Sequence, residues 1–371
     1  MPEILLEHVT KRFGQFVAVD DLSIEIEDRA FITLLGPSGC GKTTTLRMIA
    51  GLETPTEGRI MIDGKPVFDS SKGINLPPNK RDIGFLFQNY ALWPHMTVYQ
   101  NIAFGLEMLK WDRAKIRARV NELMKLLRIE SFEKRYPAEL SGGQQQRVAI
   151  ARTLAPAPRV LFMDEPLSNL DAKLRQEMRA ELKRLHTDTN STFVYVTHDQ
   201  LEAMTLSTRI CLMDGGHLQQ YDPPLTVYAR PANLFTAGFV GNPTMNFADA
   251  EVQSRTGNEA TLNVLGRGAV FRAVRGDLSA CGREAVIGIR PEYFPIREDG
   301  SVEGRVYSTL PAGMETTVRV DCGGTMMTGV VFGTVDYPVD SAVRMEATGN
   351  SIALFDRESG RSLAFGTLAF T

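Results

Sequence analysis

The stretch Gly36–Thr43, GPSGCGKT, places the tightest constraint on the fold of this chain. It fits the pattern G-x-x-x-x-G-K-[ST], and it lies between an apolar run, FITLLG, and a helix-forming segment, KTTTLRMIAG. That context predicts a phosphate-binding loop, because glycines let successive backbone N–H groups converge on phosphate oxygens and the helix N-terminus adds positive potential. We expect Lys42 to reach the β- and γ-phosphates and the Thr43 hydroxyl to be a ligand of Mg²⁺.

Apolar, strand-like runs alternate with helical stretches over the first two thirds of the chain. The runs FITLLG, RVLFMDEP, TFVYVTHD and RICLMDGG are typical of short buried strands. This order predicts an α/β domain with a mostly parallel sheet over residues 1–236, with a helical insert at about residues 88–155. After residue 237, short alternating segments such as TTVRVD and SAVRMEA, broken by GG, DG and GD turns, predict a second, all-β domain over residues 237–371.

The composition excludes several classes of protein. The chain has 371 residues, of which 43% are hydrophobic and 23% charged, and its net charge of −3 indicates no bulk attraction to nucleic acid or anionic lipid. We find no run near the roughly 18 apolar residues of a membrane-spanning helix and no signal-peptide layout at the start. The cysteines are scattered without a C-x-x-C pair, so we expect reduced thiols in a cytosolic protein: Cys40, Cys211, Cys281 and Cys322.

Two adjacent carboxylates follow the apolar run VLFM. Asp164 emerges at the carboxyl end of this strand, where open α/β sheets bind ligands, and we expect it to hold Mg²⁺. Glu165 is then placed to accept a proton from an attacking water. Adjacent carboxylates after an apolar run are common, and Glu165 would otherwise be a solvated strand-end residue. The phosphate loop upstream favours the catalytic interpretation.

Three further residues have two interpretations each. His198, after the strand TFVYVT, is either a polar loop residue or a partner of the γ-phosphate. Gln88 is either an exposed amide or a group that touches Mg²⁺ and the attacking water. Phe13 in KRFG is either a core aromatic, which the sequence alone favours, or a ring that stacks on adenine.

A second glycine turn, LSGGQQQR at Leu140–Arg147, opens a helix that continues through RVAIARTLA. Ser141 is a candidate N-cap, and the two glycines after it carry amides that can approach a phosphate closely. The order phosphate loop, glutamine, LSGGQ, apolar-D-E, SNLD and histidine resembles the ATPase subunits of ABC transporters. LSGGQ separates that family from kinases, GTPases and other P-loop proteins, and the resemblance covers nearly the whole chain.

Other segments narrow the resemblance to one subgroup. YALWPHMTVYQNIAFGL, DEPLSNLDAKLR and YVTHDQLEAMTL are similar to the ATPases of carbohydrate importers of the maltose-importer type. FVGNPTMNF, GIRPE and LFDRESGRSL resemble the C-terminal regulatory domain of that subgroup. The implied fold is a P-loop NTPase, with a RecA-like core and a helical insert, followed by an all-β OB-like (TOBE) regulatory domain.

The resemblance also implies the cofactors, ATP and Mg²⁺, and a role for each residue of the motifs. It assigns adenine stacking to Phe13, and it assigns the phosphates to Ser38, Gly39, Cys40, Gly41, Lys42, Thr43 and Thr44. Mg²⁺ is assigned to Thr43, Gln88 and Asp164, while Glu165 is the general base and His198 the γ-phosphate switch. The residues expected to contact ATP held by a partner subunit are Ser141, Gly143 and Gln144, and Asp171 ends the loop that crosses between subunits.

Four positions carry separate expectations. Phe13 stands where the family usually has tyrosine, Gln145 replaces a basic residue, and IEDRAF replaces a glycine turn, which leaves the turn at Arg29 open. For Cys40, the neighbouring Lys42 and the helix N-terminus predict a lowered thiol pKa and a reactive thiolate.

The resemblance implies a homodimer bound peripherally at the cytoplasmic face of the plasma membrane. Its partners would be two transmembrane permease subunits and, indirectly, an extracytoplasmic solute-binding protein, with no nucleic acid. Carbohydrate is the expected cargo, and polyamine, metal or anion cargo with the same mechanism stays open. The alternative from a different class is a soluble ABC ATPase acting on DNA or ribosomes. Such proteins usually carry long coiled coils or tandem cassettes, and the sequence contains neither.

Overall fold

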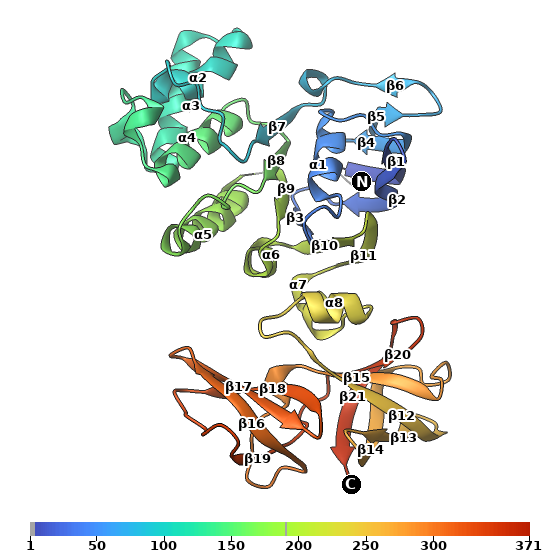
Figure 1. The fold of residues 1–371 in the computed structure, drawn as a ribbon. Helices are drawn as coiled ribbons and strands as arrows, with labels where there is room; N and C mark the ends of the chain where they lie inside the picture. Colours follow the sequence, from blue (N-terminus) through green and yellow to red (C-terminus); the bar gives the residue numbers. More distant parts are fainter. Residues whose placement is uncertain (1–3, 190) are drawn as a thin grey trace. The chain divides into compact units, whose positions relative to one another are not determined.

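A computed structural model describes residues 4–189 and 191–371, and its contacts divide the chain into two compact units. The first unit spans Met1–Pro224 and the second Leu225–Thr371 (Figure 1). This division falls earlier than the boundary expected after residue 236. No helix in the described residues is long and apolar enough to cross a membrane.

A six-stranded sheet forms the centre of the first unit, in the order β11-β10-β3-β9-β8-β7. Neighbours from β10 to β7 pair in parallel, and β11 pairs with β10 in antiparallel fashion. The strands are β3 (Phe31–Leu35), β7 (Ile83–Leu86), β8 (Val160–Asp164), β9 (Thr192–Thr197), β10 (Arg209–Asp214) and β11 (His217–Asp222). This sheet agrees with the βαβ pattern of the sequence.

Alternate residues of the buried strands serve two different hydrophobic cores. Phe193 and Tyr195 of β9 belong to a cluster with α4 (Gly142–Leu154) and α5 (Ala172–Asp188), whereas Val194 and Val196 belong to a cluster with α1 (Lys42–Ala50). This is the two-residue period of a strand whose two faces are both covered. The helices around this sheet are α1 (Lys42–Ala50), α5 (Ala172–Asp188) and α6 (Gln200–Leu206).

A second sheet in the first unit is antiparallel, in the order β2-β1-β4-β5-β6. Its strands are β1 (Ile4–Phe13), β2 (Phe16–Ile26), β4 (Glu57–Ile62), β5 (Lys65–Asp69) and β6 (Ile74–Asn75). The turn from β2 to β3 places Arg29 at φ +57°, and its N–H donates to Thr192 Oγ1 at 2.9 Å. A glycine would reach this left-handed conformation without strain, so the arginine is held there by its surroundings.

The helical insert contains α2 (Val98–Met108), α3 (Arg113–Leu126) and α4 (Gly142–Leu154). Thr97 and Gln100 form a capping box at the start of α2, and Asp112 caps α3. The buried face of α3 carries an apolar stripe at helical spacing, with Ile116, Val120, Leu123 and Met124. Short 3₁₀ turns occupy Pro78–Lys80 (η1), Glu130–Phe132 (η2) and Pro137–Glu139 (η3).

The second unit contains a closed six-stranded barrel, in the order β12-β13-β14-β21-β20-β15, and a four-stranded sheet, in the order β18-β17-β16-β19. The barrel strands are β12 (Asn246–Thr256), β13 (Glu259–Val264), β14 (Arg267–Gly276), β15 (Glu284–Ile289), β20 (Ile352–Asp356) and β21 (Ser362–Phe370). The sheet has β16 (Val302–Pro311), β17 (Glu315–Cys322), β18 (Thr325–Phe332) and β19 (Ala342–Met345), and η4 covers Pro291–Tyr293. One continuous core joins barrel and sheet.

A buried arginine explains why two helices before the barrel belong to the second unit. Arg290, 1% exposed, donates to the carbonyls of Tyr228, Ala237 and Val240, at the ends of α7 (Pro224–Ala229) and α8 (Leu234–Phe239). Its guanidinium also lies 4.0 Å from the centre of the Tyr228 ring. The arginine of the GIRPE motif therefore fixes both helices to the end of β15. This contact explains why the boundary between the units falls at the start of α7 and not within α8.

Candidate functional site

The residues singled out by the motifs follow neighbouring strands of the parallel sheet, at the edge where the strands end. The phosphate loop follows β3, His198 follows β9, Asp164 ends β8 with Glu165 directly after it, and Gln88 follows β7. Figure 1 labels these four strands. Because β3, β9, β8 and β7 are consecutive neighbours and parallel, their carboxyl ends lie side by side. The strand order therefore gathers these loops at one edge, where open α/β sheets bind ligands.

The phosphate loop depends on two glycines at its ends. Gly36 has φ +151°, and a Cβ there would lie 2.1 Å from Met213 O; Gly41 has φ +99°, and a Cβ there would lie 2.4 Å from Ala18 O. Only glycine fits either position, because the backbone is unfavourable for other residues and neighbouring carbonyls fill the space. Lys42 is buried inside the loop and donates through Nζ to the carbonyls of Gly36 and Pro37 at 2.8 and 2.7 Å.

The helix after this loop is fastened at its far end by Arg81. This arginine is 2% exposed and donates to the carbonyls of Met48 and Ile49, both at 2.9 Å, near the C-terminus of α1. It also donates to Leu76 O and Asn75 Oδ1. Burial lowers the pKa of Arg81 to about 10, so the guanidinium stays charged at neutral pH and compensates helix carbonyls that have no partner within the helix.

Thr43 and Asp164 present oxygen atoms to each other beside the loop. Thr43 Oγ1 donates to Asp164 Oδ1 at 3.0 Å, and Arg47 Nη2 lies 3.5 Å from Asp164 Oδ2. Burial raises the pKa of Asp164, while the hydrogen bond from Thr43 and the charge of Arg47 act in the opposite direction. A hydroxyl and a carboxylate oxygen are the donors that Mg²⁺ prefers, so this pair fits the ion.

Glu165 lies next to His198. Glu165 Oε2 and His198 Nδ1 are 3.4 Å apart, and the imidazole is 59% exposed, so both groups are accessible to a ligand at the sheet edge. The backbone of Glu165 has φ +46°, and its N–H donates to Val196 O at 3.1 Å. A left-handed glutamate is sterically unfavourable, and such conformations gather at functional sites.

Gln88 is connected to this group through Ser168 and Asn169, two residues that the sequence motifs did not predict. Its side-chain Nε2 donates to Ser168 Oγ at 3.2 Å, and Ser168 Oγ donates to Glu165 O at 2.9 Å. Asn169 Nδ2 donates to Gln88 O at 3.2 Å. Ser168 and Asn169 both belong to the SNLD segment, which begins three residues after Glu165. This closeness in sequence to the two carboxylates could have indicated them.

The loop after Gln88 is held in an unusual conformation by the helix of the second glycine turn. Tyr90 and Ala91 have φ +60° and +46°, two successive left-handed residues that are not glycine. Arg152 of α4 donates to the carbonyls of both, at 2.7 and 2.6 Å. This contact links the Gln88 loop to α4 through the backbone.

The structure corrects the expectation for Cys40. The thiol is 3% exposed, and burial raises its pKa, with the nearby Lys42 lowering it to a smaller extent. Lys42 Nζ lies 3.7 Å from Sγ. The prediction of a lowered pKa was wrong because the thiol faces the core beneath the loop, where desolvation of the thiolate outweighs the nearby cation.

The second glycine turn opens α4 as expected, with Ser141 directly before the helix. Gln144 Oε1 accepts from the Ser141 N–H at 3.0 Å, one half of a capping box. A Cβ on Gly143 would lie 2.7 Å from Leu174 Cδ2 of α5, so this glycine permits close packing of two helices of the same chain. Gln145 Nε2 donates to the carbonyls of Pro137 and Leu140, which gives the substituted residue a structural role at this turn.

Asp171 and Phe13, which the family resemblance also assigned to the site, each lie at the end of a helix or strand. Asp171 caps α5 by accepting from the Leu174 N–H at 3.0 Å. Phe13 pairs with Phe16 across the hairpin of β1 and β2, and both rings are exposed, at 47% and 61%. The structure therefore rejects the core interpretation of Phe13.

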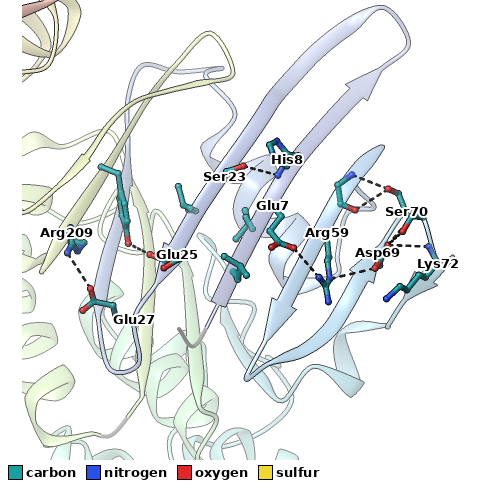
Figure 2. Close-up of a pocket in the computed structure, with 16 residues that line it drawn as sticks. Glu7, His8, Ser23, Glu25, Glu27, Arg59, Asp69, Ser70, Lys72 and Arg209 are labelled. Carbon is teal, nitrogen blue, oxygen red and sulfur yellow. Dashed lines mark hydrogen bonds and ion pairs between the residues drawn. The ribbon is translucent and has the colours of Figure 1, made fainter. Parts of the chain in front are cut away.

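A hollow of about 1010 Å³ lies elsewhere in this unit, over the outer part of the antiparallel sheet (Figure 2). Five of its charged side chains are paired with each other: Arg59 lies 3.3 Å from Glu7 and 3.7 Å from Asp69, and Arg209 lies 3.4 Å from Glu27. The motif residues are not among those that line it. We therefore place the functional site at the edge of the parallel sheet.

A phosphate loop, two carboxylates on the next strand but one and a histidine on the strand between them define a P-loop ATPase, and the LSGGQ turn places it in the ABC class. The chain belongs to the ABC transporter ATP-binding proteins. The family model "ABC transporter" matches residues 19–168, and "MalK OB fold domain" matches residues 241–294. The chain is therefore an ABC ATPase with a C-terminal OB-fold domain, as the sequence predicted.

Several proteins are similar to this chain over 60% or more of its length. The trehalose/maltose import ATP-binding protein MalK of Thermococcus litoralis is 46% identical, over 98% of this chain and 100% of its own. The spermidine/putrescine import ATP-binding protein PotA of Roseobacter denitrificans is 45% identical, over 86% of this chain and 87% of its own. A solved ATP-binding cassette, a dimer in a post-hydrolysis state with ADP and Pi, is 34% identical with a TM-score of 0.52, over 60% of this chain and 98% of its own.

Proposed function

We propose that this chain is the ATP-hydrolysing subunit of an ABC importer for a carbohydrate. The observation that carries the proposal is the convergence of the phosphate loop, Asp164, Glu165, His198 and Gln88 at one edge of the parallel sheet. The MalK OB-fold match in the second unit supports the carbohydrate-importer type. By this proposal the chain is peripheral to the cytoplasmic face of a membrane and associates with two permease subunits and, indirectly, a solute-binding protein.

The geometry supports a division of labour among the site residues. Lys42 and the backbone amides of the phosphate loop bind the phosphates, and Phe13 offers an exposed ring for adenine. Thr43 and Asp164, with Gln88, would hold Mg²⁺, which supplies charge compensation for the phosphates. Glu165 Oε2 accepts a proton from the attacking water, and His198, 3.4 Å from it, orients that water and the γ-phosphate.

The second glycine turn is assigned to the ATP of another subunit. A helix N-terminus with bare amides is suited to a phosphate, and α4 presents one at Ser141 and Gly142. Two chains arranged so that each α4 faces the other's phosphate loop would enclose two ATP molecules. ATP then joins the subunits, and its hydrolysis releases them. A relative of this chain, the cassette bound to ADP and Pi, is dimeric in its post-hydrolysis state, which supports a dimer of this ATPase.

A second cargo class has an observation in its favour. PotA, named for spermidine and putrescine import, is 45% identical, and GgtA of Synechocystis, named for uptake of osmoprotective compounds, is also 45% identical. These values are close to that of the trehalose/maltose protein, at 46%. Polyamine or osmoprotectant cargo with the same mechanism is therefore the alternative, and reconstitution with the permeases of each class would separate them.

The test of the composite site uses tagged heterodimers. Lys42→Ala removes the phosphate cation, and Ser141→Asp keeps a good N-cap while adding a carboxylate where phosphate must approach. Ser141 is preferable to Gly143, since a side chain at Gly143 collides with Leu174 of its own chain. With one lesion on each chain, both lesions fall in the same composite site and the other stays intact.

With both lesions on one chain and a wild-type partner, each composite site carries one lesion. We expect single-site nucleotide trapping in the first arrangement and none in the second. If the second arrangement is the one that traps nucleotide, the LSGGQ turn serves the ATP of its own chain, and the composite site is refuted.

A further inference from the structure

A buried cluster beneath His198 connects the sheet to α5. Glu202 of α6 is 3% exposed, and its Oε2 accepts from Tyr195 OH and Thr197 Oγ1 of β9, both at 2.7 Å. Thr197 Oγ1 also accepts from the N–H of Asp199 at 3.0 Å. The two residues that flank His198 are therefore held by the same group of hydrogen bonds.

Arg175 of α5 faces this cluster from the other side. Its Nη1 lies 3.6 Å from Asp199 Oδ2, and its Nε lies 3.9 Å from Glu202 Oε1. Its Nη2 donates to Leu170 O at 3.0 Å. One guanidinium thus contacts the residue after His198, the buried glutamate and the loop of residues 167–171.

The loop of residues 167–171 reaches the catalytic edge by a separate path. Ser168 accepts from Gln88 and donates to Glu165 O, and Asp171 caps α5 four residues before Arg175. A displacement of this loop must therefore move the carbonyl that Arg175 holds. Because Arg175 also contacts Asp199 and Glu202, the displacement reaches the backbone on the far side of His198.

Resting on the proposed role of His198, we propose that Arg175 and Glu202 are positioning residues for that histidine. They tie the loop of residues 167–171 to the backbone around His198, so that the seating of this loop sets the contact between His198 Nδ1 and Glu165 Oε2. Neither residue touches the reacting atoms. Their effect on hydrolysis passes through the orientation of the imidazole.

The test is a double-mutant cycle on the ATPase activity of the full chain. Glu202→Gln keeps an acceptor for Tyr195 and Thr197 but removes the charge that faces Arg175. Arg175→Met removes the guanidinium and keeps much of its apolar stem. Arg184→Met is the matched control, because Arg184 lies on the same helix in an exposed pair with Asp188.

We expect Glu202→Gln and Arg175→Met each to lower kcat by about tenfold to a hundredfold, since a small misplacement of a catalytic group costs rates of this order. The KM for ATP and the melting temperature of Glu202→Gln should stay close to wild type, and Arg184→Met should leave kcat unchanged. In a His198→Ala background, the same changes should lower the remaining rate by less than about twofold, because they act through the missing imidazole.

Equal losses in the wild-type and His198→Ala backgrounds would overturn the positioning role while leaving His198 itself as a functional residue. An unchanged kcat in Glu202→Gln would overturn it too. A fully active His198→Ala would instead remove the proposed role of the histidine, and the inference with it. If Arg175→Met does not fold, Glu202→Gln completes the cycle alone.

Discussion

At the scale of single residues, the site is made of side chains whose environments separate their roles. Asp164 is buried against Thr43 and Arg47, whereas Glu165, the next residue along the chain, points to an exposed histidine. Glu165 also has a left-handed backbone, directly after the last residue of β8. Asp164 therefore suits a cation, and Glu165 suits a proton from water.

Glu165→Gln is expected to bind MgATP about as tightly as wild type and to hydrolyse it slowly. The amide keeps the shape of the side chain but accepts no proton, and loss of a positioned general base costs about 10²–10⁴-fold in rate. Single-turnover hydrolysis and equilibrium binding of ATP, measured on the same preparation, check this. A turnover rate within a few-fold of wild type would show that another group takes the proton.

Sequence motifs predicted most of these residues because each motif is local. The phosphate loop, the carboxylate pair and LSGGQ each occupy a few consecutive positions, so their chemistry can be read without the fold. Cys40 was misjudged because its thiol pKa depends on burial beneath the loop, which the neighbouring Lys42 does not reveal. Ser168 and Asn169 were missed because their partner Gln88 is 80 and 81 residues away.

At the scale of elements, arginines connect backbone segments that the sequence alone does not connect. Arg81 holds carbonyls of α1, Arg152 holds the loop after Gln88, and Arg175 holds the loop before α5. The helices and strands themselves follow from apolar periodicity and caps. The arginine contacts cannot be predicted in this way, because nothing in the sequence around an arginine indicates which distant carbonyl the fold will bring to it.

Arg81→Met is expected to lower the free energy of unfolding by about 1–3 kcal/mol. The change leaves the carbonyl of Ile49 without its donor, while the carbonyl of Met48 keeps the Gly51 N–H and loses only its second donor. An unsatisfied buried polar group costs energy of this order. Urea titration of the full chain, followed by a signal from the first unit, gives the value. Arg184→Met, an exposed arginine, serves as the comparison, and equal effects of the two would rule out the capping role.

At the scale of the whole molecule, the chain joins an ATPase unit to a β unit that keeps its own core. The change in sequence texture near residue 237 precedes β12, which begins at Asn246. It did not mark the unit boundary, because α7 and α8 have helical patterns yet are fixed to β15 by Arg290. Ala237, Met245, Val286, Ala353 and Phe355 form a small core between α8 and the barrel.

A fragment of residues 225–371 is expected to unfold at a higher temperature than a fragment of residues 237–371. The shorter piece lacks α7 and the first half of α8, so Arg290 loses the carbonyl of Tyr228 and part of the helix that presents the carbonyls of Ala237 and Val240. An uncompensated buried charge costs about 3 kcal/mol or more. Thermal melts by circular dichroism compare the two, and Arg290→Met in both fragments should narrow the difference. Identical melting temperatures of the two fragments would place the boundary between the units near residue 237, where strand-like segments begin to dominate the sequence.

Arg81 and Arg290 share a property that determines how their contacts respond to ionic strength. Their hydrogen-bond partners are carbonyl groups and one amide, and within the described residues neither has a carboxylate at ion-pair distance. Exposed pairs such as Arg283 with Glu251 weaken as salt shortens the Debye length to about 10 Å at 0.1 M. Buried guanidinium–carbonyl contacts are largely shielded from that effect. Concentrated salt should therefore weaken the exposed ion pairs of this protein. The buried arginine contacts with α1, and with α7 and α8, should keep their strength.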